Sequence, residues 1–380
     1  IDTYSTTVIG SALIDSKVID NTYSDAKAAR RGNASTTIVS RYNSLTHTSA
    51  NLIDQTITNT TSFDTKGNAL TQTQDKYVLD STNTLIKITH SDITNSDYDT
   101  RGDAGTQRIA TYIVDGTVST LQTYQVFTNR SFDVSRNVVN QMVLTYSDLS
   151  GTTLLDCQEI RSSNFFSSGV AAAQTIVTYS DADKSSIIGV KAIANSDVSS
   201  GGNVGRSIIT TYSTALVANG GTGDITVKDA DALTRQTINN TSFDKYGNAL
   251  TQNVLTEFYS SGVFSFSEYQ AISNNTYDIH SRLKYSEVRS YSDALGTTFK
   301  DLQVINYLSY DVYGNALNET IDTYSTIVVG TALIDSKVID NTYSDAKAAR
   351  RGNASTTIVS RYNSLDHVSA NLIDQTITNT

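Results

Sequence analysis

Hydrophobic and polar residues alternate with a period of two over much of the chain, in segments that begin after a Gly-Asn step. Gln or a small polar residue takes the fourth place of a segment, Ile or Val usually the sixth, Thr often the eighth and Tyr the ninth. Side chains two residues apart share one face of a β-strand, so the first three positions lie on one face and the Tyr lies on the other. The pattern predicts a strand after each Gly-Asn step.

A second segment ends each unit with the pattern Gln-x-Ile-x-Asn or a relative of it, as in Gln55-Ile57-Asn59. Turns rich in Ser, Asp and Gly join the two segments. We therefore expect two strands per unit, hence roughly eighteen strands in one long repeat, and almost no helix. The exception is Ala26–Arg31, where we expect a helix. The predicted fold is all-β: a tandem array of β-hairpin repeats that forms a spiralling sheet, tube or solenoid-like fibre.

The units are about 35 residues long and are nested inside a longer repeat. Residues 321–380 repeat residues 1–60 at 55 of 60 positions, so residues 1–320 form one super-repeat and residue 321 starts the next copy. The five changes are Thr7 to Ile327, Ile9 to Val329, Ser11 to Thr331, Thr46 to Asp366 and Thr48 to Val368. No change of composition marks a boundary, so we expect residues 1–380 to form a single continuous array, cut from a longer protein.

Most units begin with an aromatic residue and a complete or degenerate copy of Asp-x-x-Gly-Asn, and a Tyr lies nine residues after the Asn position in most units. The best copies of this framework are Tyr310, Asp311, Gly314, Asn315 and Tyr324; Phe243, Asp244, Gly247 and Asn248; and Phe63, Asp64, Gly67, Asn68 and Tyr77. The recurring Asp is most simply a turn-capping residue.

At this step the chain resembles the YD-repeat family, which includes the repeats of Rhs proteins, teneurins and the shell subunits of Tc-type toxins. The resemblance implies β-hairpins that wind into a long spiralling sheet around a hollow shell. No part of the chain resembles the conserved end region or the toxin cargo of those proteins. A shell of this kind that never closes would be a tube.

Composition excludes several other classes of protein. The apolar content of 38% predicts a thin core, and the absence of Pro suits strands whose N–H groups are all needed for pairing. The formal net charge is -10 and the Lys and Arg residues are dispersed, which argues against nucleic acid and anionic membrane as partners. No apolar run is long enough to span a membrane. We expect the partners to be further copies of the repeat, in the same chain or in identical chains.

Candidate chemistry is sparse, so we expect no enzyme activity, no cofactor and no metal. The four His residues are far apart in sequence, and the structural interpretation of each is favoured over catalysis or metal binding. Gly220–Asp224, with Asp229 and Asp231, is similar to calcium-binding glycine-rich turns, but it occurs once and more simply forms a long loop. Cys157 is expected to be a small apolar core residue.

Seven Asn-x-Ser/Thr sequons are candidate N-glycosylation sites, as would suit a surface protein. They are Asn33, Asn59, Asn129, Asn240, Asn274, Asn318 and Asn353. The sequence thus indicates a structural segment of a long extracellular or cell-surface filament or tube. The alternative is the repeat stalk or shell of an adhesin or of a Rhs/Tc-type toxin whose active domain lies outside these residues.

Overall fold

The computed structural model describes residues 1–4 and 13–380, so positions 7, 9 and 11 of the first repeat copy lie outside the described residues. The described chain is all-β, with 63% strand and 6% helix, which confirms the predicted fold class. The chain divides into two compact units, one of residues 1–204 and 214–227 and one of residues 205–213 and 228–380. The single continuous array over residues 1–380 stays a prediction.

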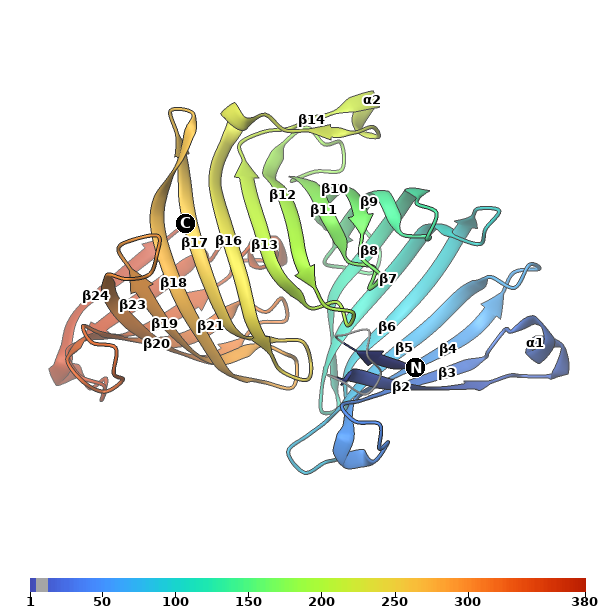
Figure 1. The fold of residues 1–380 in the computed structure, drawn as a ribbon, viewed down its shortest axis with the longest axis horizontal. Helices are drawn as coiled ribbons and strands as arrows, with labels where there is room; N and C mark the ends of the chain where they lie inside the picture. The colour runs from blue at the N-terminus through green and yellow to red at the C-terminus, as the bar shows by residue number, and fades with distance from the viewer. Residues whose placement is uncertain (5–12) are drawn as a thin grey trace. The chain divides into compact units, whose positions relative to one another are not determined.

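The first unit is an antiparallel meander in which each strand pairs with the next along the chain (Figure 1). Its strands are β1 (Asp2–Tyr4), β2 (Leu13–Thr22), β3 (Thr36–Tyr42), β4 (Leu52–Phe63), β5 (Ala69–Leu79), β6 (Leu85–Tyr98), β7 (Ala104–Asp115), β8 (Val118–Phe132), β9 (Val138–Tyr146), β10 (Leu154–Phe165), β11 (Ala171–Tyr179) and β12 (Ile187–Val198). A small hairpin, β14 (Leu216–Val217) and β15 (Ile225–Thr226), also belongs to this unit.

The second unit repeats the same meander. Its strands are β13 (Val204–Tyr212), β16 (Ala232–Phe243), β17 (Ala249–Ser260), β18 (Val263–Tyr277), β19 (Leu283–Tyr291), β20 (Phe299–Tyr310), β21 (Ala316–Tyr324), β22 (Leu333–Thr342), β23 (Thr356–Tyr362) and β24 (Leu372–Asn379). In both units two strands belong to each sequence repeat, as predicted.

Short helices occupy only a few of the connections. They are α1 (Ala26–Arg31), α2 (Ala218–Gly221) and α3 (Ala346–Arg350), with 3-10 turns η1 (Ser49–Asn51), η2 (Asp229–Asp231) and η3 (Ser369–Asn371). The prediction of a helix at Ala26–Arg31 is confirmed: Asp25 caps its N-terminus by accepting from two backbone N–H groups, and Gly32 ends it with a φ of 73°. In α2, Asn219 and Gly220 have left-handed φ values, so this segment is a hairpin tip rather than a regular helix.

The Asp-x-x-Gly-Asn step folds as a capped turn. Asp64 Oδ1 accepts from the N–H groups of Lys66 and Asn68, both at 2.8 Å, and Asp64 Oδ2 accepts from Asn68 Nδ2 at 2.8 Å. Gly67 has a φ of 98°, which an L side chain rarely adopts. Asp244 and Asp311 make the same three hydrogen bonds in their turns. The repeated Asp is therefore a turn-capping residue, as the sequence indicated.

A β-bulge lies at the ninth position of the repeat, which sequence periodicity did not predict. The register shifts between Thr111 and Tyr112, and the same shift recurs at Tyr77, Tyr179 and Tyr324. Glu257, which replaces Tyr in one repeat, also lies at such a shift. The bulge, rather than the tyrosine itself, is the constant feature, and it increases the local twist of the ribbon.

Side-chain ladders connect successive strands. Gln107 Nε2 donates to Asn95 Oδ1 at 2.9 Å, and Asn95 Nδ2 donates to the carbonyl of Ala69 at 3.1 Å. Gln141 and Asn129 make the same hydrogen bonds one sequence repeat later, and the carbonyl of Ala104 is the final acceptor. In the second unit Gln252 Nε2 donates to Asn240 Oδ1, and Asn274 Nδ2 donates to the carbonyl of Ala249. Amide side chains therefore hydrogen-bond from strand to strand along the array at these residues.

The core is thin, as the composition predicted. In the first unit most of the fully buried apolar side chains, such as Leu155, Val177 and Val190, lie on β10–β12, and Ile53 on β4 is also fully buried. In the second unit Leu302, Val304 and Tyr324 form a small core against Tyr285, Phe299 and Leu333. Much of the stability of the ribbon must therefore come from backbone pairing and side-chain ladders.

Candidate functional site

The sequence repeat of 47 residues between positions 196 and 243 carries an insertion that the other sequence repeats lack. Residues 214–227 leave the meander as the hairpin β14–β15, paired at Leu216 with Thr226 and at Val217 with Ile225. Its tip, Ala218–Gly223, turns through left-handed residues Asn219, Gly220 and Gly221. We call residues 214–227 the insert. In Figure 1 the insert lies above β10–β12 at the top of its unit, and the contacts below fix it there.

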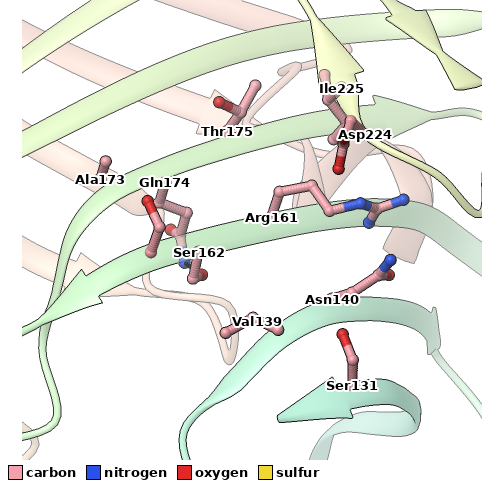
Figure 2. A pocket seen from close by; sticks show the side chains of 11 residues that line it. Ser131, Val139, Asn140, Arg161, Ser162, Ala173, Gln174, Thr175, Asp224 and Ile225 are labelled. Atoms are coloured by element: carbon pink, nitrogen blue, oxygen red, sulfur yellow. Dashed lines mark hydrogen bonds between the residues drawn. The ribbon is translucent and has the colours of Figure 1, made fainter. Parts of the chain in front are cut away.

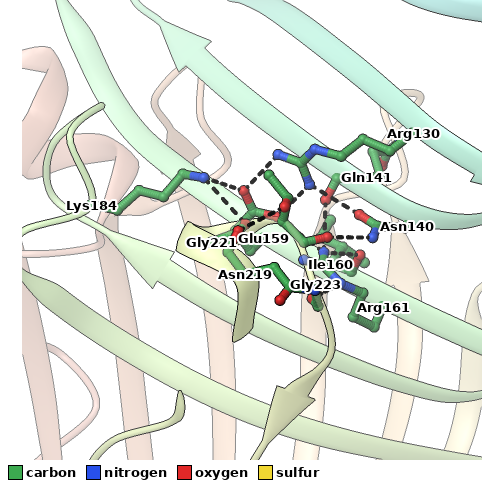
Figure 3. Close-up of polar contacts among 11 residues, drawn as sticks. Arg130, Asn140, Gln141, Glu159, Ile160, Arg161, Lys184, Asn219, Gly221 and Gly223 are labelled. Atoms are coloured by element: carbon green, nitrogen blue, oxygen red, sulfur yellow. Dashed lines mark hydrogen bonds and ion pairs between the residues drawn. The ribbon is translucent and has the colours of Figure 1, made fainter. Parts of the chain in front are cut away.

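Beneath the insert lies the fully buried carboxylate of Glu159, in the middle of β10. Arg130 donates to both carboxylate oxygens at 2.7 and 2.9 Å, and Arg161 Nη1 donates to Oε2 at 3.0 Å. Lys184 Nζ donates to Oε1 from the turn between β11 and β12 (Figure 3). Three cations therefore surround one carboxylate.

The electrostatics of this cluster keep Glu159 ionised. Burial by itself would raise the pKa of Glu159, but hydrogen bonds from Arg130, Lys184 and Arg161 outweigh burial and hold the pKa below its usual value. The strand register explains the assembly: Glu159 and Arg161 are two residues apart on β10 and so share a face.

The same cations hold the tip of the insert by its backbone carbonyls. Arg161 Nε donates to the Gly223 carbonyl at 2.8 Å, and Lys184 Nζ lies 3.4 Å from the Gly221 carbonyl. Asn140 Nδ2 donates to the Thr222 carbonyl between them at 2.8 Å. Three successive carbonyls of the insert thus bind three side chains of the sheet.

A pocket of about 370 Å³ opens beside Arg161 (Figure 2). Its walls come from β8, β9, β10, β11 and the insert, and its polar lining combines hydroxyls, amides, one guanidinium and one carboxylate. The polar residues are Ser131, Asn140, Arg161, Ser162, Ser163, Gln174, Thr175 and Asp224. Such a lining can donate and accept many hydrogen bonds to a small polar ligand.

A Ser-Asp-His group occurs once in each repeat copy. Ser16 Oγ donates to Asp2 Oδ1 at 2.5 Å and lies 2.8 Å from His47 Nε2. Ser336, Asp322 and His367 reproduce the arrangement. A nucleophilic triad needs the carboxylate on the far nitrogen of the His and an accessible Ser, whereas here the Asp binds the Ser, which is 1% exposed. These groups are therefore structural cross-links.

The Asp, Gly and Asn residues of the predicted framework lie in the turns, and its tyrosines lie in the strands. Asn68 reaches across to the next turn, where a Cβ on Gly102 would lie 2.9 Å from its Oδ1. Tyr77 and Tyr324 lie at bulges, and Tyr310 donates its hydroxyl to the Leu283 carbonyl of the preceding repeat. The framework therefore positions one repeat on the next.

Most of the sequons lie in the ladders. Asn59, Asn129, Asn240, Asn274 and Asn318 make side-chain hydrogen bonds, and Asn274 is buried. Asn33 is half-buried and Asn353 exposed, both in turns. A glycan attached to Asn129 or Asn274 would compete with the ladder, so glycosylation stays a prediction that fits Asn353 best.

Within residues 1–4 and 13–380, no three His, Cys, Asp or Glu side chains are grouped so that they could hold a metal ion. In the part of the chain that the structure describes, no helix is both long enough and apolar enough to cross a membrane. The sequence pattern did not predict the cluster of Arg130, Glu159, Arg161 and Lys184. One feature of the sequence could have indicated the cluster: Glu159 and Arg161 lie two residues apart in a predicted strand segment, so their side chains must share one face.

The geometry defines the class of this molecule as an all-β protein of tandem hairpin repeats with one inserted hairpin. No protein-family model matches the chain, and no curated protein matches it. Among solved structures, the chain is similar to a Tc holotoxin pore of Photorhabdus luminescens, with 10% sequence identity over 89% of this chain and a TM-score of 0.14. This chain spans 21% of the length of that chain. A TM-score this low carries no argument about fold or function.

Proposed function

We propose that the chain is a structural segment of a long extracellular filament or tube, with no catalytic role. The observation that carries the proposal is that two copies of one sequence, 320 residues apart, fold in the same way. In the first copy β2 pairs with β3 at Ser16 and Tyr42, and in the second β22 pairs with β23 at Ser336 and Tyr362. Each further copy can therefore add the same strands and contacts.

The cross-links of the two copies support this interpretation. The Arg41–Asp54 ion pair is reproduced by Arg361 and Asp374. The amide of Gln55 donates to Ser40 at 3.0 Å, and its counterpart Gln375 donates to Ser360 at 2.9 Å. The substitution positions at 46 and 48 lie in a turn and leave both cross-links intact. The sequence copies are thus also structural copies.

The curvature of the first unit supports a hollow form. Ser200, in the turn after β12, donates to the carbonyl of Tyr4 on β1 at 2.5 Å. A Cβ on Gly201 would lie 2.8 Å from Cγ2 of Ile14 on β2. The ribbon of β1–β12 therefore curls until its last turn contacts its first strands. A ribbon that continues past this contact would wind as a spiral.

Electron microscopy of chains with one, two and three copies of residues 1–320 tests the proposal. A filament or tube should lengthen by the same increment with each copy while its width stays constant. Particles that grow in width, or that close into compact shells, would contradict it. The closed form would instead favour the alternative, a shell or stalk of an adhesin or a Rhs/Tc-type toxin with an active domain elsewhere.

A further inference from the structure

The guanidinium of Arg161 is only partly used by the protein. Its Nη1 donates to Glu159 and to the Ile160 carbonyl, and its Nε donates to the Gly223 carbonyl of the insert. Its Nη2 is enclosed and has no hydrogen-bond partner in the described part of the chain. A buried N–H group without an acceptor costs free energy, so a ligand that supplies an acceptor to this nitrogen would be stabilised there.

The unused nitrogen belongs to the edge of the guanidinium that pairs with carboxylates elsewhere in this chain. Arg41 binds Asp54 through Nε at 3.2 Å and Nη2 at 2.5 Å. Arg235 binds Glu257 through the same two nitrogens at 2.7 and 3.0 Å. In Arg41 and Arg235, Nε and Nη2 together bind the two oxygens of a carboxylate. In Arg161, Nε binds one backbone carbonyl, that of Gly223, and Nη2 binds nothing in the described part of the chain. The Gly223 carbonyl therefore occupies half of a carboxylate site.

The charge around this edge favours an anion. Arg130, Arg161 and Lys184 face the single carboxylate of Glu159, and all three cations are at least four-fifths buried. The whole chain, in contrast, carries a formal charge of -10. Asp224 of the adjoining pocket adds a second carboxylate, so two carboxylates offset three cations and one positive charge remains to favour an anion.

The adjoining pocket indicates what else the anion carries. Its volume of about 370 Å³ exceeds the needs of a lone carboxylate and lies at the small end of ligand sites, roughly 300–1,000 Å³. Asp224 supplies an acceptor for ligand hydroxyls, and Asn140 and Ser163 supply both donors and acceptors. A ligand with one carboxylate and several hydroxyls matches this lining.

We propose that the Nε and Nη2 edge of Arg161, together with the pocket under the insert, binds the carboxylate and hydroxyls of a single uronic-acid sugar residue. The carboxylate displaces the Gly223 carbonyl from Nε and provides the missing acceptor for Nη2. The insert tip keeps its Asn140 and Lys184 contacts and acts as a lid over the sugar. This site goes beyond the structural role and does not depend on it.

Nuclear magnetic resonance of the arginine Nε–H groups in the full chain tests the proposal, with methyl β-D-glucuronide as the probe. The Arg161 signal should shift and saturate at millimolar probe, the order expected for one sugar residue in a shallow site. Methyl β-D-glucoside, which lacks the carboxylate, and acetate, which lacks the hydroxyls, should each bind at least about tenfold more weakly.

Variants separate the sugar site from a structural role of Arg161. Arg161→Lys keeps the charge and loses the two-nitrogen edge, so binding should weaken about tenfold or more. Arg235→Lys is the matched control, because it alters an edge already paired with Glu257, and it should leave binding unchanged. Asp224→Asn, on the exposed insert, should weaken the glucuronide and leave acetate unaffected.

Three results would overturn the proposal: no saturable shift of the Arg161 signal, equal binding of the glucoside, or equal binding of acetate. If Arg161→Lys fails to fold, Asp224→Asn and competition between the three probes on the unaltered chain decide the question.

Discussion

At the scale of single residues, Glu159 is fully buried and bound by three cations, so a substitution there should be costly. A fully buried carboxylate must be matched by hydrogen bonds, and Arg130, Arg161 and Lys184 supply them. Removing the negative charge would leave three partly buried cations facing one another. The cluster therefore stabilises the fold only while all of its members are present.

Glu159→Gln should lower the free energy of unfolding by about 3–5 kcal/mol, the usual cost of breaking a buried ion pair on one side. Urea unfolding at pH 7 measures the change. Glu268→Gln, on the half-exposed middle of β18, is the control and should stay within about 0.5 kcal/mol. A Glu159→Gln variant as stable as the control would show that the cations reach solvent readily.

Cys157 gives a second prediction at this scale. The side chain is fully buried, and burial raises the pKa of its thiol to about 11. Because the thiolate is the reactive form, the folded chain at pH 8 should react with a thiol reagent at least about a hundredfold more slowly than the unfolded chain. The rate in urea provides the reference. Rapid labelling of the folded chain would mean that β10 opens locally.

At the scale of the element, local signals in the sequence were enough for the hairpins and for α1. Asp25 as cap, the Ala-rich run and Gly32 as terminator are all within eight residues, so the helix could be predicted. The bulge at each ninth position could not be predicted, since it is a property of two paired strands. The Glu159 cluster was missed for a related reason: its members come from residues 130, 159, 161 and 184, which only the sheet register brings together.

The glutamine ladder gives a prediction for the elements. Gln72, Gln107, Gln141 and Gln174 each donate to a side chain of the preceding strand, at 2.7 to 3.1 Å. Replacing all four by Ala should lower stability by about 1 kcal/mol per hydrogen bond and reduce the melting temperature by several degrees. Gln303→Ala, on β20 outside this set, should have a small effect. An unchanged melting temperature in the quadruple variant would show that the ladder contributes nothing net.

At the scale of the whole molecule, stability depends on turn aspartates that repeat along the chain. Backbone N–H groups donate to Asp64, Asp99 and Asp181 and hold the pKa values of these carboxyl groups below the usual range. For Asp133 the side chain of Asn137, together with backbone N–H groups, lowers the pKa in the same way. Backbone hydrogen bonds lower the pKa of Asp293 to about 2. The caps Asp25 and Asp345 have lowered pKa values for the same reason. Each set of hydrogen bonds is stronger with an ionised carboxylate than with a neutral carboxyl group.

The sign of the pH dependence follows from these shifts. A carboxylate whose pKa is lower in the folded chain binds fewer protons there than in the unfolded chain, so its stabilisation is complete above the unfolded pKa, near 4. The stabilisation is lost as the pH falls through the lower folded values. Burial raises the pKa of Glu319, so this residue makes the folded chain less stable as the pH rises. Its effect is small beside that of the many aspartates whose pKa values are lowered. Urea midpoints should therefore be level from pH 6 to 8 and fall steadily between about pH 5 and 2. The Asp293→Asn variant should be less stable at pH 7, and its urea midpoint should fall less steeply with decreasing pH. Urea midpoints of the unaltered chain that stay level to pH 3 would mean that the turns are stable without ionised caps.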